Sequence, residues 1–276
     1  VKVPANNSGD FMKKFDLILP AGAVCKTSQN LRQLKRQYES LPFDWILTPD
    51  LDKIHHLLAN RFANFMLQEN MEYQCQESDQ TDIYFDTSTG VGFWHDFPHN
   101  VPLEQSYETI QKKYSRRIER LFAEIDRAKD ILLFRVNTVR PGSGTDINNI
   151  VYAKEVVSDQ ILEEQFRRIQ GLFPGKNLSL LEVSLFNEPH EYRYWQPTAD
   201  ITRIEVFSDI KYEWQGDPAV FRKILQDFRL KPKVILRNAA NSLMFKLRRK
   251  LINLGAALGI EKYKQNKRRL KNRFNR

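Results

Sequence analysis

Residues 15–36 read FDLILPAGAVCKTSQNLRQLKR, and this stretch decides the fold. The apolar run at 15–20 predicts a buried strand, and helical spacing predicts a helix from about Lys26 to Tyr38. A turn containing Gly22 joins the two. Cys25, one of only two cysteines in the chain, lies where the strand gives way to the helix.

Similar apolar runs recur further along the chain and are separated by helical patterns. Two more buried strands are expected at 131–136 and 178–186, and helices at 103–129 and 159–173. Strands that alternate with helices favour an α/β fold, with a sheet at least partly parallel and flanked by helices. The other expected elements are a loop at 40–50, one or two short helices at 51–67, a hairpin at 82–97, β-type runs near 192–196 and 203–208, and a helix at 218–228.

The charge of the chain is unevenly distributed between its two parts. Of the 276 residues, the last 46 carry 15 Lys and Arg against one acidic residue, whereas 1–230 carry 28 basic and 33 acidic residues. We therefore expect two parts, 1–230 as the catalytic domain and 231–276 as a basic tail. A mildly acidic body makes nucleic acid an unlikely partner.

Cys25 has the position of an activated nucleophile. Unpaired N–H groups at the start of a helix favour a thiolate, and they can also form an oxyanion hole. The carboxyl end of a strand is also where open α/β sheets place their sites. The alternative is that Cys25 is a small buried residue at a strand–helix corner, as cysteine often is.

A catalytic thiol usually works with a histidine, and His95 is the candidate. It lies in GFWHDF at the end of a hairpin strand, between Trp94 and Asp96. The other four histidines lie in a predicted helix or beside prolines in loops. The alternative for His95 is a hydrogen-bonded structural residue.

Several short blocks together resemble a bacterial family of uncharacterised proteins described as papain-like cysteine peptidases. The blocks are LPAGAVCKTSQNLRQL around Cys25, LPFDW at 41–45, WHDF at 94–97, KKYSRRIERL at 112–121, ILLFRV at 131–136 and YEWQGD at 212–217. The resemblance covers about residues 15–228. It implies a papain-like fold, with Cys25 as nucleophile and His95 as base, and hydrolysis of a peptide or amide. The chain has no Gln shortly upstream of Cys25 to supply the side-chain oxyanion donor of papain.

A third residue is needed to orient the imidazole. Asp96 is a poor candidate because neighbouring side chains on an extended strand point to opposite faces. Asp44 in LPFDW is the better candidate, although an Asp there could equally cap a turn through backbone N–H groups.

Two arginines are candidates for substrate binding. Arg135 falls at the carboxyl end of a buried strand, where it either pairs with a carboxylate such as Asp44 or binds an anionic substrate group. Arg117 lies on the long helix at 103–129, where the alternative is a solvated charged face.

The basic tail has the composition of a helix that lies on an anionic membrane. Leucines recur at helical intervals through SLMFKLRRKLINLGAALG at 242–259, and a polybasic segment follows. The expected membrane-binding residues are Lys246, Arg249, Lys250, Arg268 and Arg269. The alternatives are nucleic acid, for which aromatic residues are sparse, an acidic partner, and a helix packed on its own domain.

These observations together predict a cytoplasmic, bacterial cysteine hydrolase or peptidase that associates peripherally with a membrane. Its substrate would be an acyl, peptide or glycan-linked compound. The alternatives are an acyltransferase in surface-polysaccharide or lipid-linked glycan biosynthesis, and a non-catalytic scaffold. We expect no metal and no cofactor, because Cys75 has no nearby His or second Cys and PGSGTD at 141–146 is not a phosphate loop.

Overall fold

The computed structural model describes residues 13–48, 50–140, 152–209 and 215–257. The chain divides into two compact units, Val1–Leu230 and Lys231–Arg276. The sequence places its boundary at the same residue. Among the described helices, none has both the length and the apolarity needed to cross a membrane.

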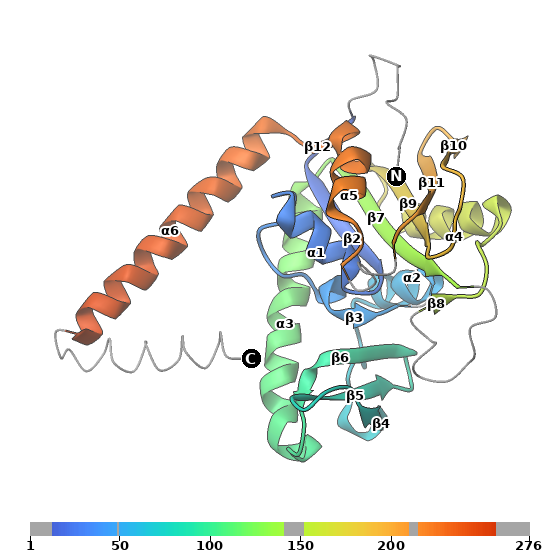
Figure 1. Ribbon diagram of the computed structural model, residues 1–276. Helices are drawn as coiled ribbons and strands as arrows, with labels where there is room; N and C mark the ends of the chain where they lie inside the picture. Colours follow the sequence, from blue (N-terminus) through green and yellow to red (C-terminus); the bar gives the residue numbers. More distant parts are fainter. Residues whose placement is uncertain (1–12, 49, 141–151, 210–214, 258–276) are drawn as a thin grey trace. The chain divides into compact units, whose positions relative to one another are not determined.

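The first unit is built on a sheet whose strands are mostly parallel (Figure 1). Four parallel strands stand in the order β11-β9-β7-β2, and β10 adds an antiparallel edge. The predicted α/β class with a partly parallel sheet is therefore confirmed. The strands are β2 (Leu17–Ala23), β7 (Asp130–Val139), β8 (Tyr152–Ala153, beside β7), β9 (Asn177–Phe186), β10 (Arg193–Thr198) and β11 (Ile201–Phe207).

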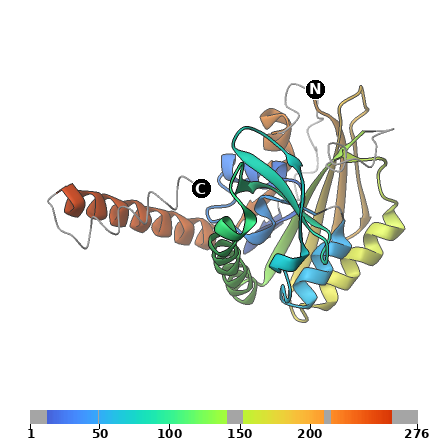
Figure 2. The same ribbon diagram turned by 90° about the horizontal axis from the view of Figure 1, so that it is seen from below.

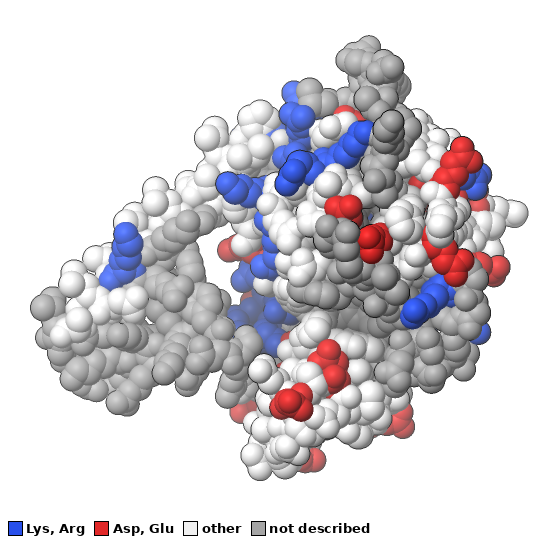
Figure 3. All heavy atoms as spheres, viewed as in Figure 1, with Lys and Arg blue, Asp and Glu red and all other residues white. Residues whose placement is uncertain are grey.

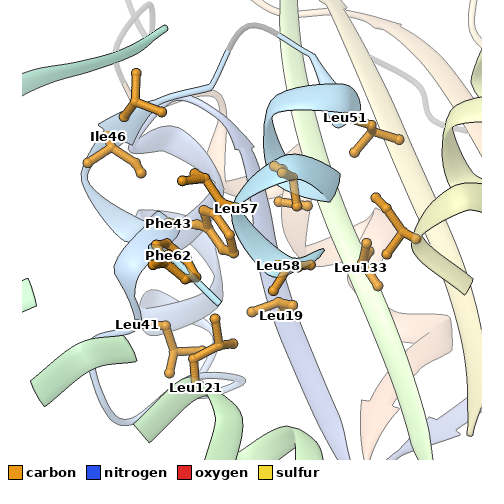
Figure 4. Packing of buried hydrophobic residues seen from close by; sticks show 14 of the residues in the cluster. Leu19, Leu41, Phe43, Ile46, Leu51, Leu57, Leu58, Phe62, Leu121 and Leu133 are labelled. Atoms are coloured by element: carbon orange, nitrogen blue, oxygen red, sulfur yellow. The ribbon is translucent and has the colours of Figure 1, made fainter. Parts of the chain in front are cut away.

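Helices cover both faces of this sheet, so its strands are apolar on both sides. Leu133 of β7 joins the core formed with α2 and α4, which pack side by side (Figures 2 and 4). Phe134, the next residue, faces the other way and packs on Phe221 of α5, with 6.3 Å between ring centroids. The helices of this unit are α1 (Lys26–Gln33), α2 (Leu51–Ala59), α3 (Leu103–Arg127), α4 (Asp159–Gly171) and α5 (Pro218–Ile224).

A smaller antiparallel sheet stands beside the main one, in the order β3-β6-β5-β4. The hairpin expected at 82–97 is its β5–β6 pair. The long helix α3 packs on both parts, because its Tyr114 contacts Phe93 of β6 while its Leu121 belongs to the core beside the main sheet (Figures 1 and 4). The strands are β3 (Ile46–Leu47), β4 (Met71–Gln76), β5 (Thr81–Asp86) and β6 (Val91–Pro98), and a separate pair joins β1 (Lys13–Phe15) to β12 (Phe228–Leu230).

Helix α1 is shorter than its sequence pattern predicts. It ends at Gln33 instead of continuing to Tyr38, because Lys35 adopts a left-handed backbone conformation with φ of 55°. The turn brings Gln37 back to donate to Asp44 at 2.8 Å. The segment between α1 and β3 is thereby folded over the helix, and it includes the one-turn helix η1 (Pro42–Asp44).

The second unit contains α6 (Pro232–Ala257), which begins ten residues before the predicted helix at 242–259. Val234 and Ile252 are buried, whereas a second set of apolar side chains is exposed. The exposed set is Leu236, Leu243, Met244, Leu247, Leu251 and Leu254. Lys246, Arg249 and Lys250 lie within α6, and Arg268 and Arg269 lie outside the described residues.

The turn that ends β2 requires glycine at position 22. Gly22 has φ of 75°, and a Cβ atom there would lie 2.0 Å from Thr48 Oγ1 and 3.0 Å from a guanidinium nitrogen of Arg135. Both neighbours are buried, so neither has room to withdraw. The approach to Cys25 therefore depends on a residue without a side chain.

We expect Gly22→Ala to destabilise the protein by about 2–4 kcal/mol, because it adds backbone strain and an overpacked methyl group. The measurement is urea unfolding at neutral pH. Gly171→Ala is the matched control, since a Cβ at Gly171 meets nothing within 4 Å. Equal unfolding midpoints for the two variants would contradict the prediction.

Candidate functional site

Cys25 occupies the N-cap position of α1, directly after β2. Cys25 is partly exposed, and the backbone N–H groups of Cys25 and Lys26 lower the pKa of its thiol. The strand-to-helix position predicted from the sequence is therefore present. Two N–H donors beside a sulfur can stabilise either a thiolate or an oxyanion that forms next to it.

The electrostatics of Cys25 differ from the simple expectation for a helix terminus. Burial raises the pKa of the Cys25 thiol above its ordinary value, and this exceeds the lowering by the Lys26 charge and the two N–H groups. Desolvation penalises the charged form of any acid. A thiol with a raised pKa is mainly neutral near neutral pH.

Lys26 was not a candidate from sequence, yet its charge is the strongest of the influences that lower the pKa of the Cys25 thiol. It is buried, and its Nζ donates to Thr138 Oγ1 of β7 at 2.7 Å. A lysine in the first turn of a helix opposes the helix dipole. A lysine at this unfavourable position in the sequence could have marked Lys26 as a candidate functional residue.

His95 lies in a bulge of β6. Tyr84 pairs with Phe93 and Asp82 pairs with Phe97, so three residues of β6 stand opposite the single residue Ile83 of β5. Bulges re-aim side chains and are common beside active sites. The His95 ring is exposed and meets Trp45 edge-on, with 6.1 Å between centroids.

Asp96 is bonded to α3 rather than to His95. Its carboxylate accepts from the Tyr114 hydroxyl at 2.5 Å and forms an ion pair with Lys113. The expectation that Asp96 is a poor partner for His95 agrees with these bonds.

The carboxylate of Asp44 is buried and surrounded by donors from α1 and its own turn. Among the described residues, no histidine bonds to it. The bond from Leu41 is the turn cap of the alternative interpretation, and the bonds from Ser28 and Arg32 also tie the turn to α1. The donors are Ser28 Oγ at 3.1 Å, Arg32 at 2.7 Å, Gln37 Nε2 at 2.8 and 3.0 Å, and the Leu41 N–H at 3.0 Å.

The segment LPFDW connects the elements that carry Cys25 and His95. Ser28, which follows Cys25 by one helical turn, bonds to Asp44, and the next residue, Trp45, contacts His95. The Arg32 guanidinium lies over the Trp45 ring, 5.6 Å from its centroid. Helix α1 therefore contacts Asp44, and the β6 bulge contacts the next residue, Trp45.

Arg135 is buried and bonds to backbone carbonyls. It is 3% exposed and donates to the carbonyls of Ala21 at 2.8 Å and Thr48 at 3.1 Å. Its neighbour across the sheet is Glu182, whose pKa is raised by burial. The suggested pairing with Asp44 is not observed, and an anion would have to displace these bonds to reach the guanidinium.

Arg117 lies on α3 with its guanidinium 5.1 Å from the centroid of the Tyr114 ring. It is partly exposed, and its Nη1 is buried without a hydrogen-bond partner. The structure thus places it on the same helix as the Asp96 partners. Arg117 remains a candidate for binding an anion.

The remaining candidates have ordinary structural surroundings. His99 bonds to Asp82 at 2.8 Å, and His190 bonds to Glu205 at 2.9 Å. Cys75 is a free cysteine on β4. Within the described ranges, no group of three or more His, Cys, Asp or Glu is arranged to hold a metal.

Comparison with known proteins gives one family and one relative. A family described as "Putative papain-like cysteine peptidase (DUF1796)" matches residues 16–159, just over half of the chain. "Uncharacterized protein R408" of Acanthamoeba polyphaga mimivirus is 29% identical over 140 residues, which cover 45% of this chain and 63% of the relative. That relative is viral, so a bacterial origin remains a prediction. No solved structure matches the chain.

The pH dependence of Cys25 alkylation tests the electrostatics of the thiol. We expect the rate with iodoacetamide to rise with an inflection above about 8.5, the pKa of free cysteine, because burial disfavours the thiolate. Lys26→Met removes the charge that lowers the pKa and should move the inflection higher. Lys112→Met, at an exposed site on α3, is the control. An inflection below 8.5 in the unmodified protein would overturn this account.

Proposed function

Because the chain belongs to the family described as "Putative papain-like cysteine peptidase (DUF1796)", we propose that it is a cysteine hydrolase in which Cys25 is the nucleophile and His95 the general base. The observation that supports this most directly is the position of Cys25 at the N-cap of α1, where nearby backbone N–H groups lower the pKa of its thiol. The approach of α1 and the β6 bulge to Asp44 and Trp45 adds to it.

The proposed reaction begins with a neutral thiol. His95 takes the proton of Cys25 as the sulfur attacks the acyl carbon, and the N–H groups of Cys25 and Lys26 stabilise the oxyanion. The protonated His95 then gives its proton to the departing amine, and a thioester remains on Cys25. Water, deprotonated by His95, hydrolyses the thioester and restores the thiol.

Within the part of the chain that the structure describes, Asp44, the expected third residue of this site, accepts from other donors and has no hydrogen bond to His95. Asp44 orients α1 and η1, and the group in contact with His95 is the Trp45 ring. We propose that Asp44 positions His95 indirectly, because its ion-pair partner Arg32 lies over Trp45, the ring that contacts His95.

Thioester formation on Cys25 tests the proposal. With p-nitrophenyl acetate, mass spectrometry of the digested protein should show an acetyl group on Cys25 and none on Cys75. His95→Ala should slow acetylation by about 100-fold or more, the usual range for a lost general base. His56→Ala is the control, since His56 is exposed on α2. Equal acetylation of both cysteines, or an unchanged rate in His95→Ala, would contradict the proposal.

The same experiment separates hydrolysis from acyl transfer. A hydrolase releases the acetyl group to water without any added compound. An acyltransferase retains the thioester until an acceptor hydroxyl or amine is supplied. A substrate linked to a glycan or a lipid carrier is consistent with the second outcome.

We propose, in addition, that α6 and the basic segment after it hold the protein at an anionic membrane surface. The exposed leucines of α6 offer an apolar face, and each basic residue near such a surface contributes about 1 kcal/mol. Lys250 is exposed on the same helix.

Sedimentation with lipid vesicles tests this association. We expect binding to vesicles that contain phosphatidylserine, weaker binding at high salt, and little binding to pure phosphatidylcholine. Leu247→Gln with Leu251→Gln should reduce binding, whereas Ile161→Gln, at an exposed apolar residue of α4, should not. Equal binding to the two lipid compositions would remove the electrostatic basis of the proposal.

A further inference from the structure

Cationic side chains of α1 and α3 gather around the segment at 39–45. Figure 3 shows Lys and Arg along the region that α3 occupies in Figure 1. The side chains of Arg32, Lys113 and Arg120 are 30%, 21% and 26% exposed, so a solvent-borne ligand can reach them. Arg117 lies between Lys113 and Arg120 on α3.

Three of these four cations are neutralised one for one. The ion pairs are Arg32 with Asp44 at 2.7 Å, Lys113 with Asp96, and Arg120 with Glu39 at 3.1 Å. Each carboxylate comes from the segment at 39–45 or from the β6 bulge. The cluster would therefore be neutral without Arg117.

Arg117 leaves the cluster with one uncompensated positive charge. Among the described residues it has no ion pair, and its Nη1 is buried without a hydrogen-bond acceptor. Its guanidinium lies over the Tyr114 ring, with 5.1 Å between the guanidinium carbon and the ring centroid. Buried donors in native proteins nearly always have an acceptor, so this nitrogen points to an acceptor that the chain itself does not supply.

The cluster borders the proposed reaction site. Tyr114, on which Arg117 lies, bonds to Asp96, the residue next to His95. On the other side, Arg32 lies over Trp45, which His95 contacts. The cations thus flank the pair formed by His95 and Trp45.

We propose that this cluster binds a phosphate group carried by the substrate of Cys25. A tetrahedral phosphate can accept from Arg117 and from cations on neighbouring elements at once, whereas a planar carboxylate is satisfied by one guanidinium. The proposal rests on the proposed function for the link to Cys25, but phosphate binding by the cluster does not depend on that chemistry. The substrate class is then a phosphorylated acyl compound.

Calorimetric titration of the full chain with inorganic phosphate tests the site, with acetate as a second titrant. We expect phosphate to bind and acetate to bind at least tenfold more weakly. Arg117→Gln should weaken phosphate binding at least tenfold, and Arg117→Lys, which keeps the charge but not the fork of donors, should be intermediate. Lys112→Gln, an exposed cation on α3 paired with Glu108, is the matched control and should bind like the unmodified protein.

Thermal unfolding of each variant shows that a loss of binding is not a loss of fold. The proposal is overturned if phosphate does not bind to the unmodified chain, or if folded Arg117→Gln binds it equally well. Failure of the proposed function gives a different result. In that case no thioester forms on Cys25, but Cys25→Ala still binds phosphate and Arg117→Gln binds it more weakly. Thioester formation without phosphate binding removes the phosphate site alone.

Discussion

The site depends on how the end of β2 is joined to the segment that leads into α2. Arg135 donates to the carbonyls of Ala21 and Thr48, and the Thr48 N–H donates to the Ala23 carbonyl at 2.8 Å. A buried guanidinium is tolerated only when its donors are satisfied. These bonds therefore hold the strand that precedes Cys25 in register with the segment that follows Trp45. The small sheet carries His95 and includes β3 of that segment, so the bonds of one buried arginine join the two elements that are proposed to carry the site.

A second buried contact, at Asp44, explains why the site has an aromatic ring beside its histidine. The carboxylate is fully occupied by α1 and by its own turn, which fixes the start of the helix against LPFDW. It cannot then also accept from His95 without losing a donor. Trp45 is held by Arg32 and meets the His95 ring edge-on, an arrangement that restrains the ring without fixing its tautomer. A neutral thiol with a general base fits this environment better than a preformed ion pair.

The sequence predicts the elements better than the chemistry of the site. Apolar runs identify β2, β7 and β9, and the position of Cys25 follows from the end of β2, because these features are local. The raised pKa of Cys25 does not follow, since burial depends on what packs over the turn. The bulge that exposes His95 arises from the pairing of β6 with β5, and strand alternation alone does not reveal it. The sequence around Asp44 fits either a cap or a catalytic residue, and the donors that surround its carboxylate come from residues distant enough in sequence that the pattern alone does not reveal them.

The raised pKa of Cys25 and the proposed phosphate site are physically consistent with each other. A thiolate formed before binding would repel the negatively charged phosphate group of the proposed substrate. A neutral thiol avoids that repulsion, and its charge develops only as His95 takes the proton. In the proposed mechanism, the buried Lys26, which bonds to Thr138 of β7, would provide a positive charge as the negative charge forms. The body of the chain carries more acidic than basic residues, so local cations around LPFDW would be needed to draw an anion to this point.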